Sequence, residues 1–135
     1  MIYTIDTNVV IRYLRKDSKV LANFRAAVSG GHTLLVPKIV DYEVTRGFER
    51  FAAPKKQAIY LELIENDILT VEEMNDDYWN RACKVYSELC QKGFTVGELD
   101  ILIAAFCLEN GGTLVTNNLK DFENIDGLNI IDWTK

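Results

Sequence analysis

Short runs of apolar residues alternate with longer segments whose apolar positions recur every three or four residues along this 135-residue chain. The short runs predict buried strands, and the periodic segments predict helices with one face in a core. Strands are expected at residues 2–5, 33–36, 68–71, 113–116 and 128–131. Helices are expected at residues 9–14, 18–28, 37–51, 54–66, 76–92 and 96–109.

Several local signals refine these boundaries. Thr7 or Asn8 is expected near the N-cap of the first helix. Pro37 suits the first turn of the third helix, where its missing N–H costs nothing. In that helix, an apolar stripe at helical spacing is formed by Val40, Val44, Phe48 and Phe51. The run from Ile101 to Leu108 is apolar on all sides, so this helix is expected in the centre of the molecule.

The alternation of strands and helices predicts an α/β fold, formed as a single domain over residues 1–135 around a parallel or largely parallel sheet covered on both faces. In such folds, ligands bind beyond the carboxyl ends of the strands, near a point where the strand order reverses. Asp6 follows the first strand, and Thr116, Asn117 and Asn118 follow the fourth. Short polar segments in these positions are typical of a ligand-binding site.

Composition narrows the function classes. The net charge of −5 argues against a simple basic nucleic-acid binder. No apolar run is long enough to span a bilayer, and the start shows no signal peptide, so a cytoplasmic location without membrane attachment is expected. The three cysteines, none in a CxxC pair, are interpreted as reduced core thiols: Cys83, Cys90 and Cys107.

Three carboxylates are candidates for chemistry, although each has a structural explanation on its own. Asp6 follows a buried strand, where it could cap a helix. Glu43 lies at the edge of an apolar stripe, where a long acid usually reaches solvent, and Gly47 removes bulk one turn further on. Asp100 lies in the first turn of its helix, where the macrodipole favours it.

Together these acids predict a metal site. If Asp6, Glu43 and Asp100 meet at the start of the central helix, their repulsion requires a cation or a captured proton. Hard oxygen ligands without a Cys or His cluster favour Mg²⁺ or Mn²⁺ over zinc. The single histidine, His32, follows a Gly-Gly turn and is interpreted as a surface residue.

Four segments resemble the PIN-domain ribonucleases, and among them the VapC-type toxins of toxin–antitoxin pairs: IDTNVVIRYL, VDYEVTRGF, ELDILIAAFCLENGGTLVTNNLKDF and LNIIDW. The resemblance implies a three-layer α/β/α fold and Mg²⁺- or Mn²⁺-dependent endonucleolytic cleavage of RNA. It also implies a cognate antitoxin that blocks the site, and a homodimer. Carried over residue by residue, the metal-holding acids are Asp6, Glu43 and Asp100.

The chain departs from this family pattern at one position. Many PIN domains place a fourth acid two residues after the Thr that ends the fourth strand, where this chain has Asn118. Asp121 could replace it if the loop curls back, whereas Glu98, two residues from Asp100, is expected to point elsewhere. One tightly held metal is therefore favoured over two.

The remaining assignments follow from this hypothesis. Thr7, Asn8 and Thr116 are expected to hold the carboxylates by hydrogen bonds. Phosphate neutralisation is assigned to five basic residues: Arg12, Arg15, Lys16, Arg46 and Arg50. The spacing of Tyr13, Phe48 and Phe51 favours the core over base stacking.

Three alternative functions stay open from the sequence. A PIN fold without catalysis could tether RNA or protein, and Asn118 in place of an acid keeps this alternative open. A housekeeping RNA-processing nuclease would carry the same acids as a toxin. A phosphoacceptor receiver domain also has an acid after its first strand, but it needs paired acids there, and this chain has only Asp6.

Overall fold

A computed structural model describes residues 1–135, in which five strands form one parallel sheet in the order β3-β2-β1-β4-β5. The strands are β1 (Ile2–Ile5), β2 (Thr33–Pro37), β3 (Thr70–Glu72), β4 (Thr113–Val115) and β5 (Asn129–Ile131). Because the chain steps from β1 to β2 and β3, and then crosses to β4 on the other side of β1, the strand order reverses between β1 and β4. The parallel α/β fold predicted from the sequence is confirmed.

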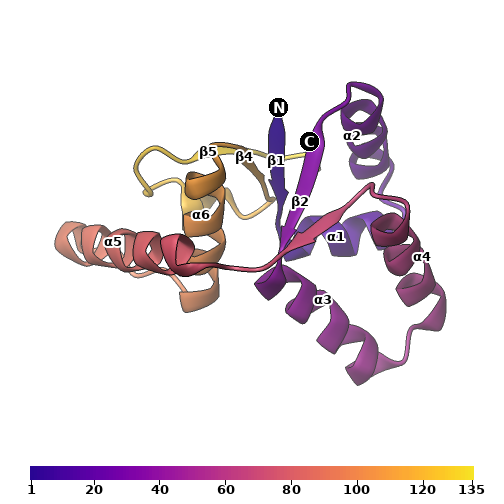
Figure 1. Ribbon diagram of the computed structural model, residues 1–135, viewed down its shortest axis with the longest axis horizontal. Helices are drawn as coiled ribbons and strands as arrows, with labels where there is room; N and C mark the ends of the chain where they lie inside the picture. The colour runs from indigo at the N-terminus through magenta and orange to yellow at the C-terminus, as the bar shows by residue number, and fades with distance from the viewer.

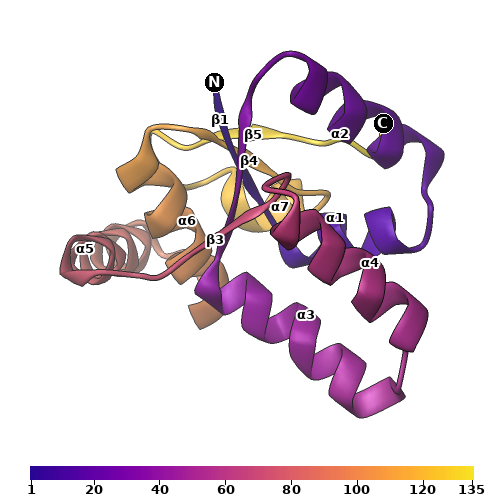
Figure 2. The same ribbon diagram turned by 45° about the vertical axis from the view of Figure 1, so that its right-hand side comes forward.

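Helices cover both faces of this sheet, as Figures 1 and 2 show. The helices α5 (Asp76–Lys92) and α6 (Glu98–Asn110) lie on one side. On the other side lie α1 (Thr7–Leu14), α2 (Ser18–Ser29) and α4 (Pro54–Glu65), while α3 (Lys38–Phe51) extends from the end of β2. A short helix, α7 (Leu119–Phe122), follows β4. The result is the three-layer arrangement that the resemblance implied.

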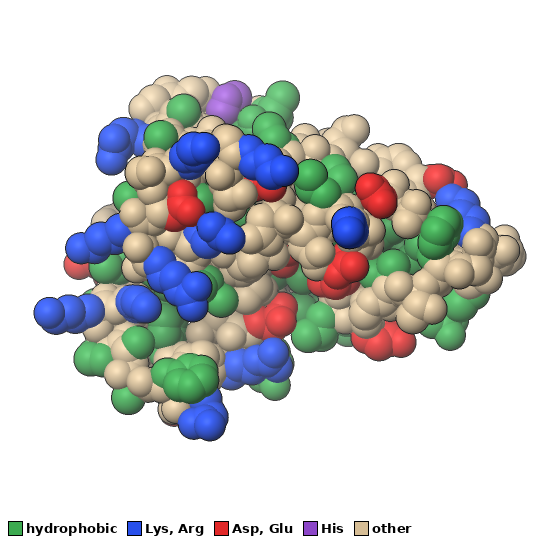
Figure 3. All heavy atoms as spheres, turned by 180° about the vertical axis from the view of Figure 1, so that it is seen from behind, with side chains coloured by type: hydrophobic (Ala, Val, Ile, Leu, Met, Phe, Trp, Pro, Cys, Tyr) green, Lys and Arg blue, Asp and Glu red, His purple; other side chains and the backbone are tan.

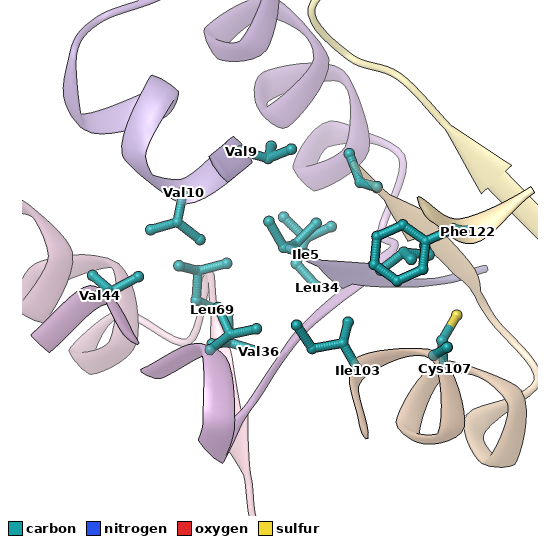
Figure 4. Close-up of a cluster of buried hydrophobic side chains, with 14 of the residues drawn as sticks. Ile5, Val9, Val10, Leu34, Val36, Val44, Leu69, Ile103, Cys107 and Phe122 are labelled. Atoms are coloured by element: carbon teal, nitrogen blue, oxygen red, sulfur yellow. The ribbon is translucent and has the colours of Figure 1, made fainter. Parts of the chain in front are cut away.

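The core joins the sheet to the helices on both faces. Figure 4 shows side chains of β1, β2, α1 and α6 meeting there, among them Ile5, Val9, Val36 and Ile103. In α6, Ile101 and every residue from Ile103 to Cys107 are buried, which confirms the expected central position of this helix. A helix buried on all sides holds its first turn rigidly against the end of the sheet.

Some predicted helix boundaries are wrong by one or two residues. The N-cap of α1 is Asp6, whose side chain accepts the Thr7 N–H, and Thr7 and Asn8 are the first two residues of the helix. Pro37 is the last residue of β2 and precedes α3 instead of occupying its first turn. The helix expected from residue 96 begins at Glu98, after Gly97 in extended conformation.

Two predictions about burial are also wrong. Phe51 is 75% exposed, because α3 extends past the core before it ends at Ala52 in the left-handed conformation. Cys83 and Cys90 are exposed, and only Cys107 is a core thiol. The buried stripe of α5 consists of other residues, namely Tyr78, Ala82, Val85 and Leu89.

The sequence pattern missed α7 entirely. This helix has four residues, which is too short to display a helical period. Its Phe122 is fully buried and anchors the loop after β4 against the core. Among all the helices, none combines the length and hydropathy that crossing a membrane requires.

Candidate active site

Asp6 lies where β1 ends and α1 begins, at the carboxyl end of the sheet. Its side chain is held by three donors: the Thr7 N–H at 2.7 Å, Asn8 Nδ2 at 2.9 Å and Thr116 Oγ1 at 2.7 Å. Asp6 is only 4% exposed, and this burial raises its pKa although the three hydrogen bonds act in the opposite direction. Its carboxylate is therefore rigidly oriented, as a metal ligand or a catalytic acid must be.

The loop after β4 completes the support of Asp6. Thr116 is fully buried, donates to Asp6 and accepts the Asn118 N–H at 3.0 Å. The Asn8 side chain accepts the Asn117 N–H at 3.2 Å, which ties α1 to this loop. These contacts bring Asn8 and Thr116 to the Asp6 carboxylate, as expected from the sequence.

Glu43 reaches the same region from α3. Its Oε1 accepts a 2.8 Å hydrogen bond from Thr7 Oγ1, and its Oε2 lies 3.6 Å from Arg46 Nη2. The carboxyl side chain is 18% exposed, so it does not extend into solvent as an acid beside an apolar stripe often does. Thr7 thus links Glu43 to the segment that carries Asp6.

Asp100 faces other acids from the first turn of α6. Its pKa is raised to about 6, mainly by burial and then by the negative charges of Asp6, Asp121 and Glu43, in that order. Asp100 has no cationic partner within ion-pair distance. Carboxylates from the residue after β1 and from α3, α6 and α7 therefore gather at one end of the sheet. Arg46, beside Glu43, is the one basic side chain that forms an ion pair with any of them.

Asp121 lies beside Asp100, on the side of the cluster formed by the loop after β4. Its carboxylate accepts a short hydrogen bond from Asn118 Nδ2 and also lies within hydrogen-bond reach of Asp100. Asn118 thereby orients Asp121 toward the acid cluster instead of supplying a charge itself. Glu98 lies away from this cluster, beside Trp79 and Tyr86 of α5, as expected.

The chemistry of these donors fits a hard divalent cation. All of them are carboxylate oxygens, and their mutual repulsion would be relieved by such an ion. No three acidic, histidine or cysteine side chains lie close enough to surround one ion together. Mg²⁺ binds through one or two carboxylates and keeps several waters, so this looser arrangement suits Mg²⁺ better than zinc. His32 packs against the Tyr3 ring, near the opposite end of the strands.

The five basic residues selected from the sequence lie on α1, α3 and the turn after α1. Arg46 contacts Glu43, whereas Arg12 forms a 3.3 Å ion pair with Asp17. Arg50 lies over the Phe51 ring, and Arg15 and Lys16 are exposed. Figure 3 shows Lys and Arg side chains gathered on the half of the molecule formed by α1 to α4.

A groove runs from Glu43 along α1 and α3. Its volume is about 210 Å³, and its walls carry the apolar side chains of Ile11, Leu14, Val44, Phe48 and Phe51. Arg15 and Lys56 lie at its rim, and Gly47 leaves space between the two helices. The groove and the acid cluster share the Glu43 side chain.

Comparisons with known proteins agree with this architecture. The family model described as PIN domain matches residues 3–128. The chain is 27% identical to "Ribonuclease VapC2" of Rickettsia felis over the full length of both, and 31% identical to the "tRNA(fMet)-specific endonuclease VapC" of Salmonella typhimurium over 97% of each. Its fold is similar to that in the crystal structure of VapBC2 from Rickettsia felis bound to a promoter DNA fragment, with a TM-score of 0.89, 25% identity, and coverage of 98% of this chain and 99% of that one. In the DNA-bound VapBC structure from Salmonella typhimurium, the TM-score is 0.86, the identity 27% and the coverage 98% of each chain.

Proposed function

Because the chain belongs to the PIN-domain family, we propose that it is a metal-dependent endoribonuclease and the toxin of a toxin–antitoxin pair. The observation that carries this proposal is the placement of Asp6, Glu43, Asp100 and Asp121 at the carboxyl end of the sheet, near enough for their charges to act on Asp100. The names of the similar proteins, which include ribonucleases, a tRNA endonuclease and toxin–antitoxin complexes, support it.

In this proposal Asp6 and Asp100 hold Mg²⁺ or Mn²⁺, with Glu43 completing the site or orienting the attacking water. A bound divalent ion would activate that water and neutralise negative charge on the scissile phosphate. Thr7, Asn8 and Thr116 keep the carboxylates in position through the hydrogen bonds described above. Asn118 holds Asp121 toward Asp100. The positions of Arg46 and Arg15 suit contacts with phosphates that flank the cleaved bond.

We also propose that the groove between α1 and α3 receives the antitoxin. Its apolar walls fit the apolar face of a peptide helix. A basic residue of that peptide, placed beside Glu43, would neutralise the acid cluster and exclude the RNA. The homodimer implied by the family resemblance is proposed as well, and light scattering of the purified chain tests it.

Replacement of single carboxylates tests the nuclease assignment. Asp6→Asn and Asp100→Asn keep the shape of each side chain but remove one negative charge, and RNA cleavage in Mg²⁺ is expected to fall by at least a hundredfold, or about 3 kcal/mol of barrier. Glu88→Gln, which removes an exposed acid of α5, is expected to leave the rate unchanged. Wild-type rates in either Asp variant would refute the assignment.

A further inference from the structure

A second cavity lies beside the acid cluster, between the beginning of α3 and the beginning of α5. Its volume is about 210 Å³, several times the ~30 Å³ that one water takes up in the liquid. It is lined by Lys38, Ile39, Tyr42, Glu73, Met74 and Trp79. Lys38 and Glu73 directly follow β2 and β3, so the cavity opens at the same edge of the parallel sheet as Asp6.

Two large aromatic side chains face solvent in this cavity. Tyr42 is 57% exposed and Trp79 is 47% exposed. Neither belongs to the buried stripe of its helix, which in α3 consists of Val40, Val44 and Phe48. The core therefore does not require an aromatic residue at either position, and both rings are accessible to a ligand.

One side chain connects this cavity to the acid cluster. The Arg46 guanidinium lies 5.1 Å from the centroid of the Tyr42 ring, and its Nη2 lies 3.6 Å from Glu43 Oε2. Only the Arg46 side chain thus lies between a ligand in contact with Tyr42 and the proposed catalytic acid Glu43. The positive charge of Arg46 between the two places suits a phosphate that joins them.

The lining matches an unpaired nucleobase. Bases of single-stranded RNA stack on aromatic side chains, and this stacking tolerates any base because each base has a π face. The edge of a base also presents hydrogen-bond donors and acceptors. Lys38 donates to Asp41 Oδ2 at 3.2 Å and has further N–H donors for a base, and exposed Glu73 supplies an acceptor.

We propose that this cavity binds one unpaired base of the RNA substrate, next to the scissile phosphate, by stacking on Tyr42 and Trp79. The proposal rests on the proposed function, because it names where part of the substrate of that same site is held. The proposed site predicts that single-stranded segments are cleaved in preference to duplex RNA, because a paired base cannot leave its helix without an energetic cost.

The fluorescence of Trp79 tests this directly. The chain has two tryptophans, and Trp133 is only 4% exposed, so added RNA can reach Trp79 alone. We expect a short single-stranded RNA to quench the emission of Asp6→Asn protein in EDTA in a saturable manner, and a duplex of the same sequence to quench it much less. Equal quenching by both, or quenching by neither, would overturn the proposal.

Variants separate stacking from other contacts. Tyr42→Ala and Trp79→Ala are each expected to weaken binding of a labelled single-stranded RNA about tenfold, while Tyr42→Phe and Trp79→Phe, which keep a ring, retain most of the affinity. Tyr86→Ala removes another exposed aromatic residue of α5, outside this cavity, and is expected to bind normally. Unchanged affinity in both alanine variants of the cavity, or an equal loss in Tyr86→Ala, would contradict the assignment.

A cleavage assay distinguishes failure of this site from failure of the proposed function. In wild-type background, Tyr42→Ala is expected to raise KM with little change in kcat, because it removes binding that is equal in ground and transition states. If Asp6→Asn abolishes cleavage but RNA does not quench Trp79, the base site alone is refuted. If Asp6→Asn cleaves normally while single-stranded RNA still quenches Trp79, the base site stands and the catalytic assignment fails.

Discussion

At the scale of single residues, the acid cluster combines rigid support of Asp6 with repulsion at Asp100 that no basic side chain relieves. Asp6 is held by three donors, whereas Asp100 gains no cationic partner and its pKa rises to about 6. A carboxyl group that is harder to ionise in the folded protein than in the unfolded chain reduces stability at neutral pH. The cluster therefore costs the fold stability in exchange for a site that attracts a cation.

This cost predicts how Asp100→Asn changes stability. The folded pKa of about 6 lies above the ordinary value of 3.8, so the folded protein binds the extra proton, and its stability declines as the pH rises through 6. In EDTA at pH 8, Asp100→Asn is expected to melt at a higher temperature than the wild type, and the difference is expected to vanish near pH 4. Thermal melts at several pH values measure this.

The control for that prediction is Glu88→Gln, which also removes one negative charge but lies exposed on α5. Millimolar Mg²⁺ is expected to raise the melting temperature of the wild type more than that of Asp100→Asn, because the ion binds only the folded state. If the difference in melting temperature between the wild type and Asp100→Asn does not depend on pH, repulsion at Asp100 is not the source of that difference.

At the scale of elements, α3 contributes to both the acid cluster and the groove. Its Val40, Val44 and Phe48 pack into the core and hold Glu43 at the Asp6 loop. One turn beyond Glu43, Gly47 has no heavy atom within 4 Å of the position a Cβ would occupy. Glycine is therefore not required here by packing, and its effect is to keep the groove open.

Gly47 substitutions separate helix stability from partner binding. Gly47→Ala is expected to stabilise the protein by about 0.5–1 kcal/mol, because alanine loses less backbone entropy in a helix and meets no obstacle. Gly47→Leu would also favour the helix but would fill the groove and weaken binding of the antitoxin. Urea unfolding measures the first effect, and titration with the proposed antitoxin measures the second.

In that experiment Gly47→Ala is the matched control, since it changes the same position with one methyl group. Loss of antitoxin affinity in Gly47→Leu but little in Gly47→Ala would support the groove as the binding site. Tight binding by a well-folded Gly47→Leu protein would show that the antitoxin binds elsewhere on the surface.

At the scale of the whole molecule, the net charge of −5 conceals two oppositely charged parts. Residues 1–61 have a net charge of +5 and residues 62–135 a net charge of −10. The first part forms α1 to α3 and most of α4, where Figure 3 shows the basic side chains. An RNA backbone is therefore attracted to this half, and the proposed base cavity lies at its border, where the beginning of α3 faces the beginning of α5.

This asymmetry predicts which lysines and arginines affect RNA binding. Arg15→Gln is expected to weaken binding several-fold at low salt and to reduce the slope of log affinity against log salt by about 0.7, the value for one phosphate contact on a single strand. Lys84→Gln, on exposed α5, is expected to change neither. Filter binding of Asp6→Asn protein at several salt concentrations measures both, and equal effects of the two variants would contradict this orientation.

Patterns along the chain were enough to predict the strands, most of the helices and the polar segments after β1 and β4. These features depend on the period of apolar residues and on caps, which involve only near neighbours along the chain. The same reasoning singled out Asp6, Glu43 and Asp100 as residues in unusual positions, but it offered capping as an equal explanation for Asp6. The structure shows that Asp6 both caps α1 and faces the cluster.

Which side chains contact one another depends on the three-dimensional fold. That Asp121 faces Asp100, that Thr7 donates to Glu43, and that Tyr42 and Trp79 share a cavity depend on the strand order and on the crossover from β3 to β4. Such contacts join residues many positions apart, so no local period encodes them. The exposure of a side chain also depends on the fold. Phe51 and Cys83 fit apolar patterns, yet both are exposed because the core ends before it reaches them.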